Sequence, residues 1–221
     1  MSAWPPSKSA VIGEFIATAF LLIAIVGSGI AAERLSGGNV ALALLANALA
    51  TSAALFVLIL VFAPISGAHM NPVVSLATAL AGGLNWRLVP IYAAAQIAGA
   101  ILGTWIAHGM FELPILEVGT QLRSGTGQWL AEVVATLGLL GVIWGCLSYG
   151  TPVAAGAVAA YIGGAYWFTA STSFANPAVT LARSLTDTFA GIRPIDTPGF
   201  IAAQVVGMLI ALPFMRAQRN D

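Results

Sequence analysis

Long apolar windows dominate this chain, and polar residues gather in short segments between them. A window of about 20 mainly apolar residues is long enough for a helix to cross a hydrocarbon core of roughly 30 Å. The pattern therefore predicts six transmembrane helices, over residues 10–32, 40–62, 88–109, 128–149, 153–171 and 197–215.

Two shorter apolar segments interrupt this pattern, and each begins with an Asn-Pro pair. They run from Asn71 to Ala81 and from Asn176 to Ala190. The first has about 10 residues, or roughly 15 Å of helix, which is half a bilayer. Asn is a favoured N-cap and Pro suits the first helical position. Each segment predicts a half-helix entered from a re-entrant loop, with starts at Pro72 and Val73 and at Pro177 and Ala178.

The sequence also repeats itself around these segments. "GEFIATAFLL" from Gly13 returns as "AEVVATLGLL" from Ala131, and "YAAAQIAGAIL" from Tyr92 returns as "FIAAQVVGMLI" from Phe200. Each half contains three full spans, an odd number, so the second half enters the membrane inverted. We expect one domain over residues 1–221, with inverted halves at approximately 8–110 and 126–215. The predicted fold is an all-α membrane protein with six transmembrane helices and two re-entrant half-helices.

Composition agrees with a membrane protein and excludes several functions. Only 7% of residues are charged and 59% are hydrophobic, whereas about one quarter of an average globular protein is charged. The net charge is zero and Lys8 is the only lysine, so we expect no nucleic-acid partner. Cys146 has no second cysteine to pair with and is interpreted as a small buried hydrophobe. His108 ends the third span and is interpreted as an interfacial residue.

The Asn-Pro loops predict a polar point inside an apolar pore. Irregular backbone at membrane depth must face water or be hydrogen-bonded within the protein. We expect Asn71 and Asn176 to cap their half-helices through the side-chain oxygen, which leaves the side-chain NH₂ free to donate. An inverted repeat brings these two amides together near the midplane, at the positive ends of two helix dipoles. A neutral solute with oxygen lone pairs is favoured there, and a cation is opposed.

These motifs together resemble those of the aquaporin and aquaglyceroporin family. "ISGAHMNPVVS" resembles the family's SGxHxNPA motif, "TSFANPAVT" matches its second half, and the repeat pairs Glu14 with Glu132 and Gln96 with Gln204. The resemblance implies one pore per subunit, a homotetramer and a cell membrane location with both termini in the cytoplasm, in a bacterial inner membrane. It also implies the cation barrier at the half-helix ends, which is the accepted explanation for aquaporin pores. Lys and Arg are shared almost equally between the two sides, so orientation rests on the resemblance.

The resemblance also points to a selectivity filter, in which this chain departs from the family. An Arg normally stands three residues after the second Asn, and here that position is Val179. Spacing from the asparagines places the other filter residues at Thr51, Gly164 and Ser173, which are small where water-selective members have Phe and His. We expect a wide, uncharged filter that passes solutes larger than water. Val73 replaces the usual Ala, and its bulk is expected to narrow the midplane or shift the loop.

Several polar residues allow two interpretations. Arg183 either adds positive potential at the outer mouth or extends to the interface and pairs with Asp187, and we favour the pairing. His69 either lines the cytoplasmic half of the pore or braces its loop. Glu14 and Glu132 either accept hydrogen bonds from the re-entrant loops, which we favour, or form a proton relay.

The function that follows is a passive channel for small neutral solutes. Glycerol-like polyols are the family default, and arsenite is a candidate because bacterial relatives associated with arsenic resistance resemble this chain in carrying Val at the filter. We expect some water permeation, exclusion of ions and protons, and membrane lipid as a partner. The alternatives are a water-selective aquaporin and a coupled secondary transporter, which needs titratable groups that alternate between sides. No nucleophile–base set or metal-ligand cluster is found in the sequence, so we predict no enzyme, metal or cofactor.

Overall fold

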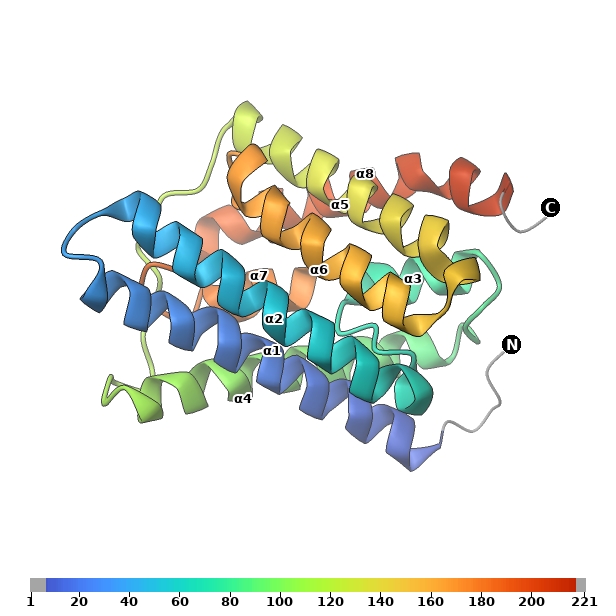
Figure 1. The fold of residues 1–221 in the computed structure, drawn as a ribbon, viewed down its shortest axis with the longest axis horizontal. Helices are drawn as coiled ribbons and strands as arrows, with labels where there is room; N and C mark the ends of the chain where they lie inside the picture. Colours follow the sequence, from blue (N-terminus) through green and yellow to red (C-terminus); the bar gives the residue numbers. More distant parts are fainter. Residues whose placement is uncertain (1–6, 218–221) are drawn as a thin grey trace.

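The computed structural model describes residues 7–217, and over these residues the chain is helical (Figure 1). Eight α-helices follow one another, with short 3₁₀ turns at Leu147–Tyr149 and Pro194–Asp196. They are α1 (Lys8–Leu35), α2 (Val40–Ser66), α3 (Pro72–Leu80), α4 (Leu88–Met110), α5 (Thr126–Cys146), α6 (Thr151–Phe168), α7 (Pro177–Arg183) and α8 (Thr197–Ala217).

Six of these helices are long and two are short, as the sequence predicts. Five of the long segments are apolar enough to cross a membrane, with window hydropathies between 1.5 and 2.5. The sixth, α6, has 18 residues and includes two Tyr and three Gly, and it packs between α2 and α5. The half-helices α3 and α7 have 9 and 7 residues, too few to span. The predicted fold class is confirmed.

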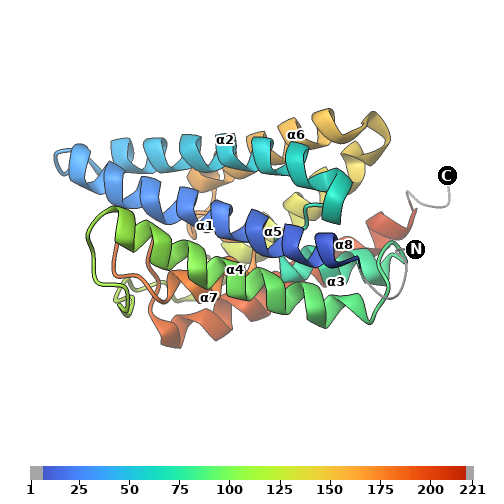
Figure 2. The same cartoon turned by 90° about the horizontal axis from the view of Figure 1, so that it is seen from below.

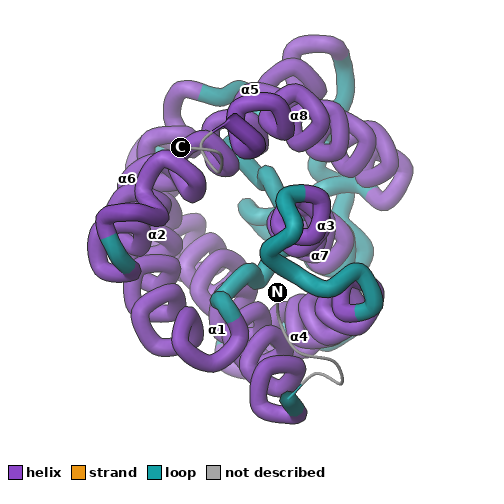
Figure 3. The backbone as a smooth tube through the Cα atoms, turned by 90° about the vertical axis from the view of Figure 1, so that its right-hand side faces the viewer, coloured by secondary structure: helices purple, strands orange, loops and turns teal. Residues whose placement is uncertain are grey.

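The contacts between helices repeat from one half of the chain to the other. α1 packs on α2 and α4, and α5 packs in the same way on α6 and α8. The halves meet where α2 lies along α6 (Figure 2) and where each half-helix contacts the last long helix of both halves. Viewed from one end, α3 and α7 lie one behind the other between α4 and α8, where they complete the ring of helices (Figure 3). The start of α1 and the end of α8 lie at the same end of the molecule (Figure 1).

Glycines allow the paired long helices to approach closely. A Cβ at Gly99 or Gly103 of α4 would lie 2.2 Å from the carbonyl oxygen of Phe15 or Ala19 on α1. In the second half, a Cβ at Gly207 of α8 would lie 2.6 Å from the Val133 carbonyl oxygen on α5. Small residues are typical where membrane helices pack by backbone contact. This close approach brings the polar residues of α1 and α4, and of α5 and α8, within hydrogen-bonding distance of each other.

The second half-helix is shorter than expected. The sequence predicted it from Asn176 to Ala190, but α7 ends at Arg183. The backbone N–H groups of Ser184 and Leu185 bond three residues back, in a tight turn. The Arg183 carbonyl then accepts from the Ile192 N–H at 3.1 Å, so the chain has already turned back on itself.

Candidate functional site

The two re-entrant loops have the same unusual backbone. Ala68 and Met70 in the first loop have φ values of 49° and 48°, and Ser173 and Ala175 in the second have 52° and 48°. The left-handed region is unfavourable for residues with a Cβ, by roughly 1–3 kcal/mol each. Such a conformation persists only where the surrounding groups fix it, and two buried carboxylates do so here.

Glu14 of α1 accepts hydrogen bonds from the first loop with both of its oxygens. Oε1 accepts from Ser66 Oγ at 2.6 Å and from the His69 N–H at 2.9 Å. Oε2 accepts from the Met70 N–H and from Gln96 Nε2, both at 2.7 Å. The carboxylate is completely buried, and a carboxylate has about four acceptor sites, so its capacity is filled.

Glu132 of α5 makes the equivalent set in the second loop. Oε1 accepts from Ser171 Oγ at 2.6 Å and from the Phe174 N–H at 2.9 Å. Oε2 accepts from the Ala175 N–H at 2.8 Å and from Gln204 Nε2 at 2.6 Å. Four donors on each carboxylate favour the bracing interpretation over a proton relay.

Asn71 and Asn176 cap the half-helices and also join the two loops. Asn71 Oδ1 accepts from the Val73 N–H at 3.0 Å, and Asn176 Oδ1 accepts from the Ala178 N–H at 2.9 Å. Each Nδ2 donates across the midplane, Asn71 to the Ala175 carbonyl and Asn176 to the Met70 carbonyl, both at 2.7 Å. The expectation of a wholly free NH₂ is therefore corrected. One hydrogen of each amide holds the opposite loop, and one remains for a solute.

A cavity of about 420 Å³ is lined by both Asn71 and Asn176. Apolar side chains line it on either side, at four-residue intervals along the helices, so one face of each helix forms the wall. Val74 and Val179, each three residues after its Asn, both line the cavity. Val73 is buried and is not among the lining residues, so the expected narrowing by its bulk is corrected. The apolar lining from the long helices includes Leu21, Ile25, Leu55, Ile59, Leu139, Ile143, Ala154, Val158 and Ile162.

Of the four predicted filter residues, three line the cavity. Thr51, Ser173 and Val179 do so, whereas Gly164 does not. The lining positions of α6 recur every four residues as far as Tyr166, and a Cβ at Gly164 would instead meet the Phe168 ring at 3.6 Å. Tyr166 takes the place expected for Gly164, and its hydroxyl donates to Thr51 Oγ1 at 3.2 Å. The phenol ring of Tyr166 therefore occupies the side of the cavity that was expected to be left open by Gly164.

Arg183 does not extend to the interface. It is 2% exposed, it lines the cavity, and its Nε donates to the Ala190 carbonyl. Its guanidinium carbon lies 3.5 Å from the centroid of the Phe174 ring, a cation–π contact. Asp187, its predicted partner, instead accepts from the N–H and hydroxyl of Thr120 at 3.0 and 2.7 Å. The predicted Arg183–Asp187 pair is wrong, because the chain turns at Ser184 and carries Asp187 away.

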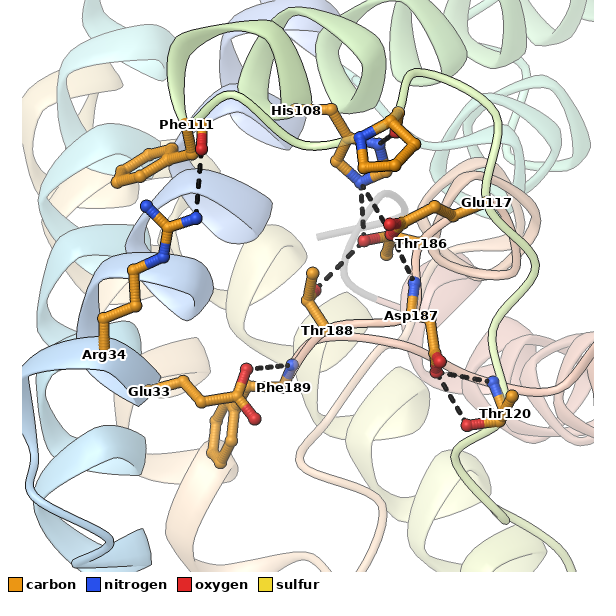
Figure 4. Close-up of polar contacts among 11 residues, drawn as sticks. Glu33, Arg34, His108, Phe111, Glu117, Thr120, Thr186, Asp187, Thr188 and Phe189 are labelled. Carbon is orange, nitrogen blue, oxygen red and sulfur yellow. Dashed lines mark hydrogen bonds and ion pairs between the residues drawn. The ribbon is translucent and has the colours of Figure 1, made fainter.

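The segment that follows α7 contacts α1, α4 and the segment before α5 through polar groups (Figure 4). His108 was expected at the interface but is completely buried. Its Nδ1 lies 2.8 Å from the Pro114 carbonyl oxygen and its Nε2 lies 2.7 Å from Thr186 Oγ1. The Phe189 N–H donates to Glu33 at 3.1 Å. These bonds connect α4 and the end of α1 to the segment after α7, and so fix the loop that carries Ala190.

His69 lies on the cavity wall and is also bonded into its loop. Its backbone N–H donates to Glu14. Its ring packs edge-on against Tyr92 with centroids 5.6 Å apart, and its Nδ1 lies 3.0 Å from Ser75 Oγ. The ring orientation is therefore set from two sides.

Two cavity-lining residues, and a third that contacts one of them, were missed by the sequence reasoning. Tyr166, Phe174 and Arg123 carry no motif of their own. Phe174 stands two residues before Asn176, as His69 stands two before Asn71, so comparison of the halves was a usable signal. Arg123 lies in the loop before α5, with its guanidinium carbon 5.1 Å from the Phe174 centroid. Burial lowers the pKa of this loop arginine, and nothing local in the sequence indicates that position.

A cavity crossing an inverted repeat of helices, with two Asn-capped half-helices at its centre, defines a membrane channel. The chain belongs to the major intrinsic protein family, whose model matches residues 2–174. It is 51% identical over 205 residues to aquaglyceroporin AqpS of Rhizobium meliloti (strain 1021), covering 93% of this chain and 88% of the relative. It is 31% identical over 197 residues to the probable aquaporin TIP1-1 of Oryza sativa subsp. japonica, covering 82% and 76%.

The fold has a counterpart among solved structures. The X-ray structure of the aquaglyceroporin from Plasmodium falciparum superposes with a TM-score of 0.71 at 25% identity, covering 94% of this chain and 95% of that one. Members of this family are passive channels. The predictions of a membrane channel and of a protein that is not an enzyme are confirmed by that membership.

Proposed function

We propose that this channel conducts small neutral hydroxylated solutes such as glycerol, and that arsenite and water also pass. The observation that carries this proposal is the cavity past both asparagines, with Val179 on its wall where the family has a charged Arg. The name aquaglyceroporin given to the Rhizobium relative supports a solute larger than water.

The mechanism follows from the lining. A solute entering the cavity gives up part of its water shell, because most of the lining is apolar. At the centre, the remaining amide hydrogens of Asn71 and Asn176 donate to solute oxygens and so replace part of that hydration. The same arrangement offers two donors and no acceptor from these amides, which interrupts a chain of proton-conducting water.

The residues at the predicted filter favour a solute with both carbon and hydroxyl groups. Val179 offers methyl groups, while Thr51 with Tyr166 and Ser173 offer hydroxyls. A polyol has both kinds of surface, so one side can face the apolar wall and its hydroxyls the polar one. A water-selective aquaporin is the second candidate, favoured only by the Tyr166 phenol that occupies the position expected to be open.

A coupled transporter is disfavoured by the same contacts that fix the loops. Glu14 and Glu132 are completely buried among the helices, and each already accepts four hydrogen bonds. A group that binds and releases an ion during transport needs a free coordination site. Neither carboxylate offers one.

We further propose a bacterial inner-membrane homotetramer with both termini in the cytoplasm. A bacterial relative at 51% identity supports the location, and α1 and α8 place the described chain ends on one side (Figure 1). Large apolar side chains on the outer faces of the helices, such as Phe56, Val134 and Trp167, suit contact with lipid or neighbouring copies. In this orientation the Arg183 end of the cavity is the outer mouth.

Stopped-flow light scattering of proteoliposomes tests the solute range. Wild type, Val179→Arg and Val179→Leu are compared with water, glycerol and arsenite. We expect wild type to pass all three and the Arg variant to keep water while losing the larger solutes, since a guanidinium fills space and adds charge beside Thr51 and Ser173. The Leu variant controls for added bulk without charge. Wild type that passes only water, unchanged in Val179→Arg, would show that Val179 is not at the constriction.

A further inference from the structure

The two halves of the channel are nearly equivalent, and the positions where they differ are informative. Positions at equal distances from Asn71 and Asn176 generally carry similar residues and contacts. Three cavity-lining pairs of equivalent positions differ between the halves. Ala68 corresponds to Ser173, His69 to Phe174, and Thr78 to Arg183. Ser173 and Arg183 add polar groups that the first half lacks at these positions, and both lie at the same end of the cavity.

The hydroxyl of Ser173 is not needed by its loop. Ala68 has almost the same φ, 49° against 52°, and its N–H donates to Ser66 Oγ as the Ser173 N–H donates to Ser171 Oγ, both at 3.2 Å. The first loop therefore forms without a hydroxyl at this position. Ser173 Oγ is buried on the cavity wall and has no hydrogen-bond partner among residues 7–217. A buried hydroxyl without a partner is unfavourable unless something else bonds to it.

The guanidinium of Arg183 is not needed by its half-helix either. Thr78, the equivalent residue on α3, satisfies its hydroxyl within its own helix by donating to the Val74 carbonyl at 2.7 Å. Arg183 uses only Nε, in the bond to Ala190. Its two Nη groups form no hydrogen bond or salt bridge within the described part of the chain, although the residue is 2% exposed and lines the cavity. A buried charge normally has its donors satisfied.

We propose that Arg183 and Ser173 form a solute-binding subsite one helical turn beyond Val179, for solutes with two adjacent oxygen atoms. The inference rests on the proposed channel function, which it deepens by naming the feature that the channel recognises. The two Nη groups present a planar pair of donors that matches two oxygens on neighbouring atoms. Stacking on Phe174 at 3.5 Å and the bond to Ala190 hold that plane in one orientation. Ser173 Oγ supplies a third polar contact.

The subsite also gives this end of the cavity a positive charge, whereas the described residues that line the other end include no Lys or Arg. Arg123 lies 5.1 Å from the same Phe174 ring, so two guanidinium groups share one aromatic side chain. At the opposite mouth the equivalent ring is His69 and the equivalent of Arg183 is the neutral Thr78. Cations are therefore opposed at the Arg183 mouth before they reach the asparagines.

Two propanediol isomers test the subsite without a change in solute size. 1,2-Propanediol has adjacent oxygens, and 1,3-propanediol has the same atoms with the oxygens one carbon further apart. Flux of each is measured by stopped flow in wild type, Arg183→Thr and Ser173→Ala, whose new residues are those that the other half of the chain uses at the same positions. Thr78→Val at the opposite mouth is the matched control, and Arg183→Lys keeps the charge while removing the planar pair.

We expect wild type to pass the 1,2-isomer about three- to tenfold faster than the 1,3-isomer, the range for the net contribution of one ordinary hydrogen bond. Arg183→Thr and Arg183→Lys should lose that preference, which is the ratio of the two diol fluxes and so does not depend on how the substitution changes the overall permeability. Ser173→Ala should reduce the preference, and Thr78→Val should keep it. The subsite alone is overturned if wild type passes glycerol but passes the two diols at equal rates. It is also overturned if the preference for the 1,2-isomer survives in Arg183→Thr. If wild type passes water but no diol or glycerol, the proposed function fails and the subsite with it.

Discussion

Replacing Glu14 with Gln gives the most direct test of how the re-entrant loop is held. The substitution keeps the size of the side chain and exchanges one acceptor oxygen for an NH₂ group. Four donors point at the carboxylate, two at each oxygen. A Gln oxygen keeps two of them, whereas the other two face a group that also donates.

The magnitude follows from those two lost bonds. Each buried donor left without an acceptor costs about 1–3 kcal/mol, so two cost about 2–6 kcal/mol. If the NH₂ group takes the Oε2 position, the donors affected are the Met70 N–H and Gln96 Nε2. Gln96 Oε1 is buried without a partner in the described chain, so rotation of this amide restores one bond and lowers the cost to about 1–3 kcal/mol. The Met70 N–H stays unsatisfied in either case.

Thermal unfolding in detergent and glycerol flux in proteoliposomes measure the result. We expect Glu14→Gln and Glu132→Gln to lower the unfolding temperature by similar amounts, because the two carboxylates have equivalent partners, and to reduce flux through a displaced loop. Glu112→Gln, at an exposed position on the loop after α4, is the control and should unfold like wild type. A Glu14→Gln variant with unchanged stability and unchanged flux would refute the bracing argument. Unchanged stability with altered proton movement would favour the relay.

Two further substitutions test the packing around the cavity. Gly103→Ala should destabilise the protein by about 1–3 kcal/mol or more, because its Cβ would lie 2.2 Å from the Ala19 carbonyl oxygen and would push α1 from α4. Gly141→Ala on α5 meets nothing within 4 Å and should be neutral or slightly stabilising in the same melting experiment; equal melting of the two variants would contradict the close packing. Tyr166→Phe should cost about 0.5–1.5 kcal/mol through the lost bond to Thr51, and should raise glycerol flux relative to water by removing an oxygen atom from the cavity wall. Tyr149→Phe, at an exposed position, is its control, and a fall in glycerol flux in Tyr166→Phe would show that the phenol assists passage.

Much of the fold was predictable because its signals are local or repeated. The hydropathy pattern predicted the long helices. The Asn-Pro pairs predicted the starts of α3 and α7, because helix capping depends on neighbouring residues. The repeat gave the inverted arrangement. The end of α7 was not predictable in the same way, because Ser184 and its neighbours continue the apolar helical pattern and only the bond from Ile192 to the Arg183 carbonyl shows where the chain turns.

The candidate site was predictable only in part, and the reason is geometric. Val179 and Ser173 stand at fixed distances from Asn176, so counting from that residue places them on the cavity wall. Gly164 is on a different helix, where an error of two positions exchanges a glycine for Tyr166. Arg183 was assigned a partner four residues away on the assumption that α7 continued, and the assignment failed when the helix ended. Burial of His108 depends on Pro114 and Thr186, which lie on separate loops.

The crossed bonds from Asn71 to Ala175 and from Asn176 to Met70 have a consequence for biogenesis. When the ribosome has delivered only the first half, the Asn71 amide and the Met70 carbonyl have no counterpart, because both partners lie more than 100 residues later in the chain. The crossed bonds at the centre of the cavity therefore cannot form until the second half has inserted. A chain that ends before Asn176 leaves the Met70 carbonyl without its donor.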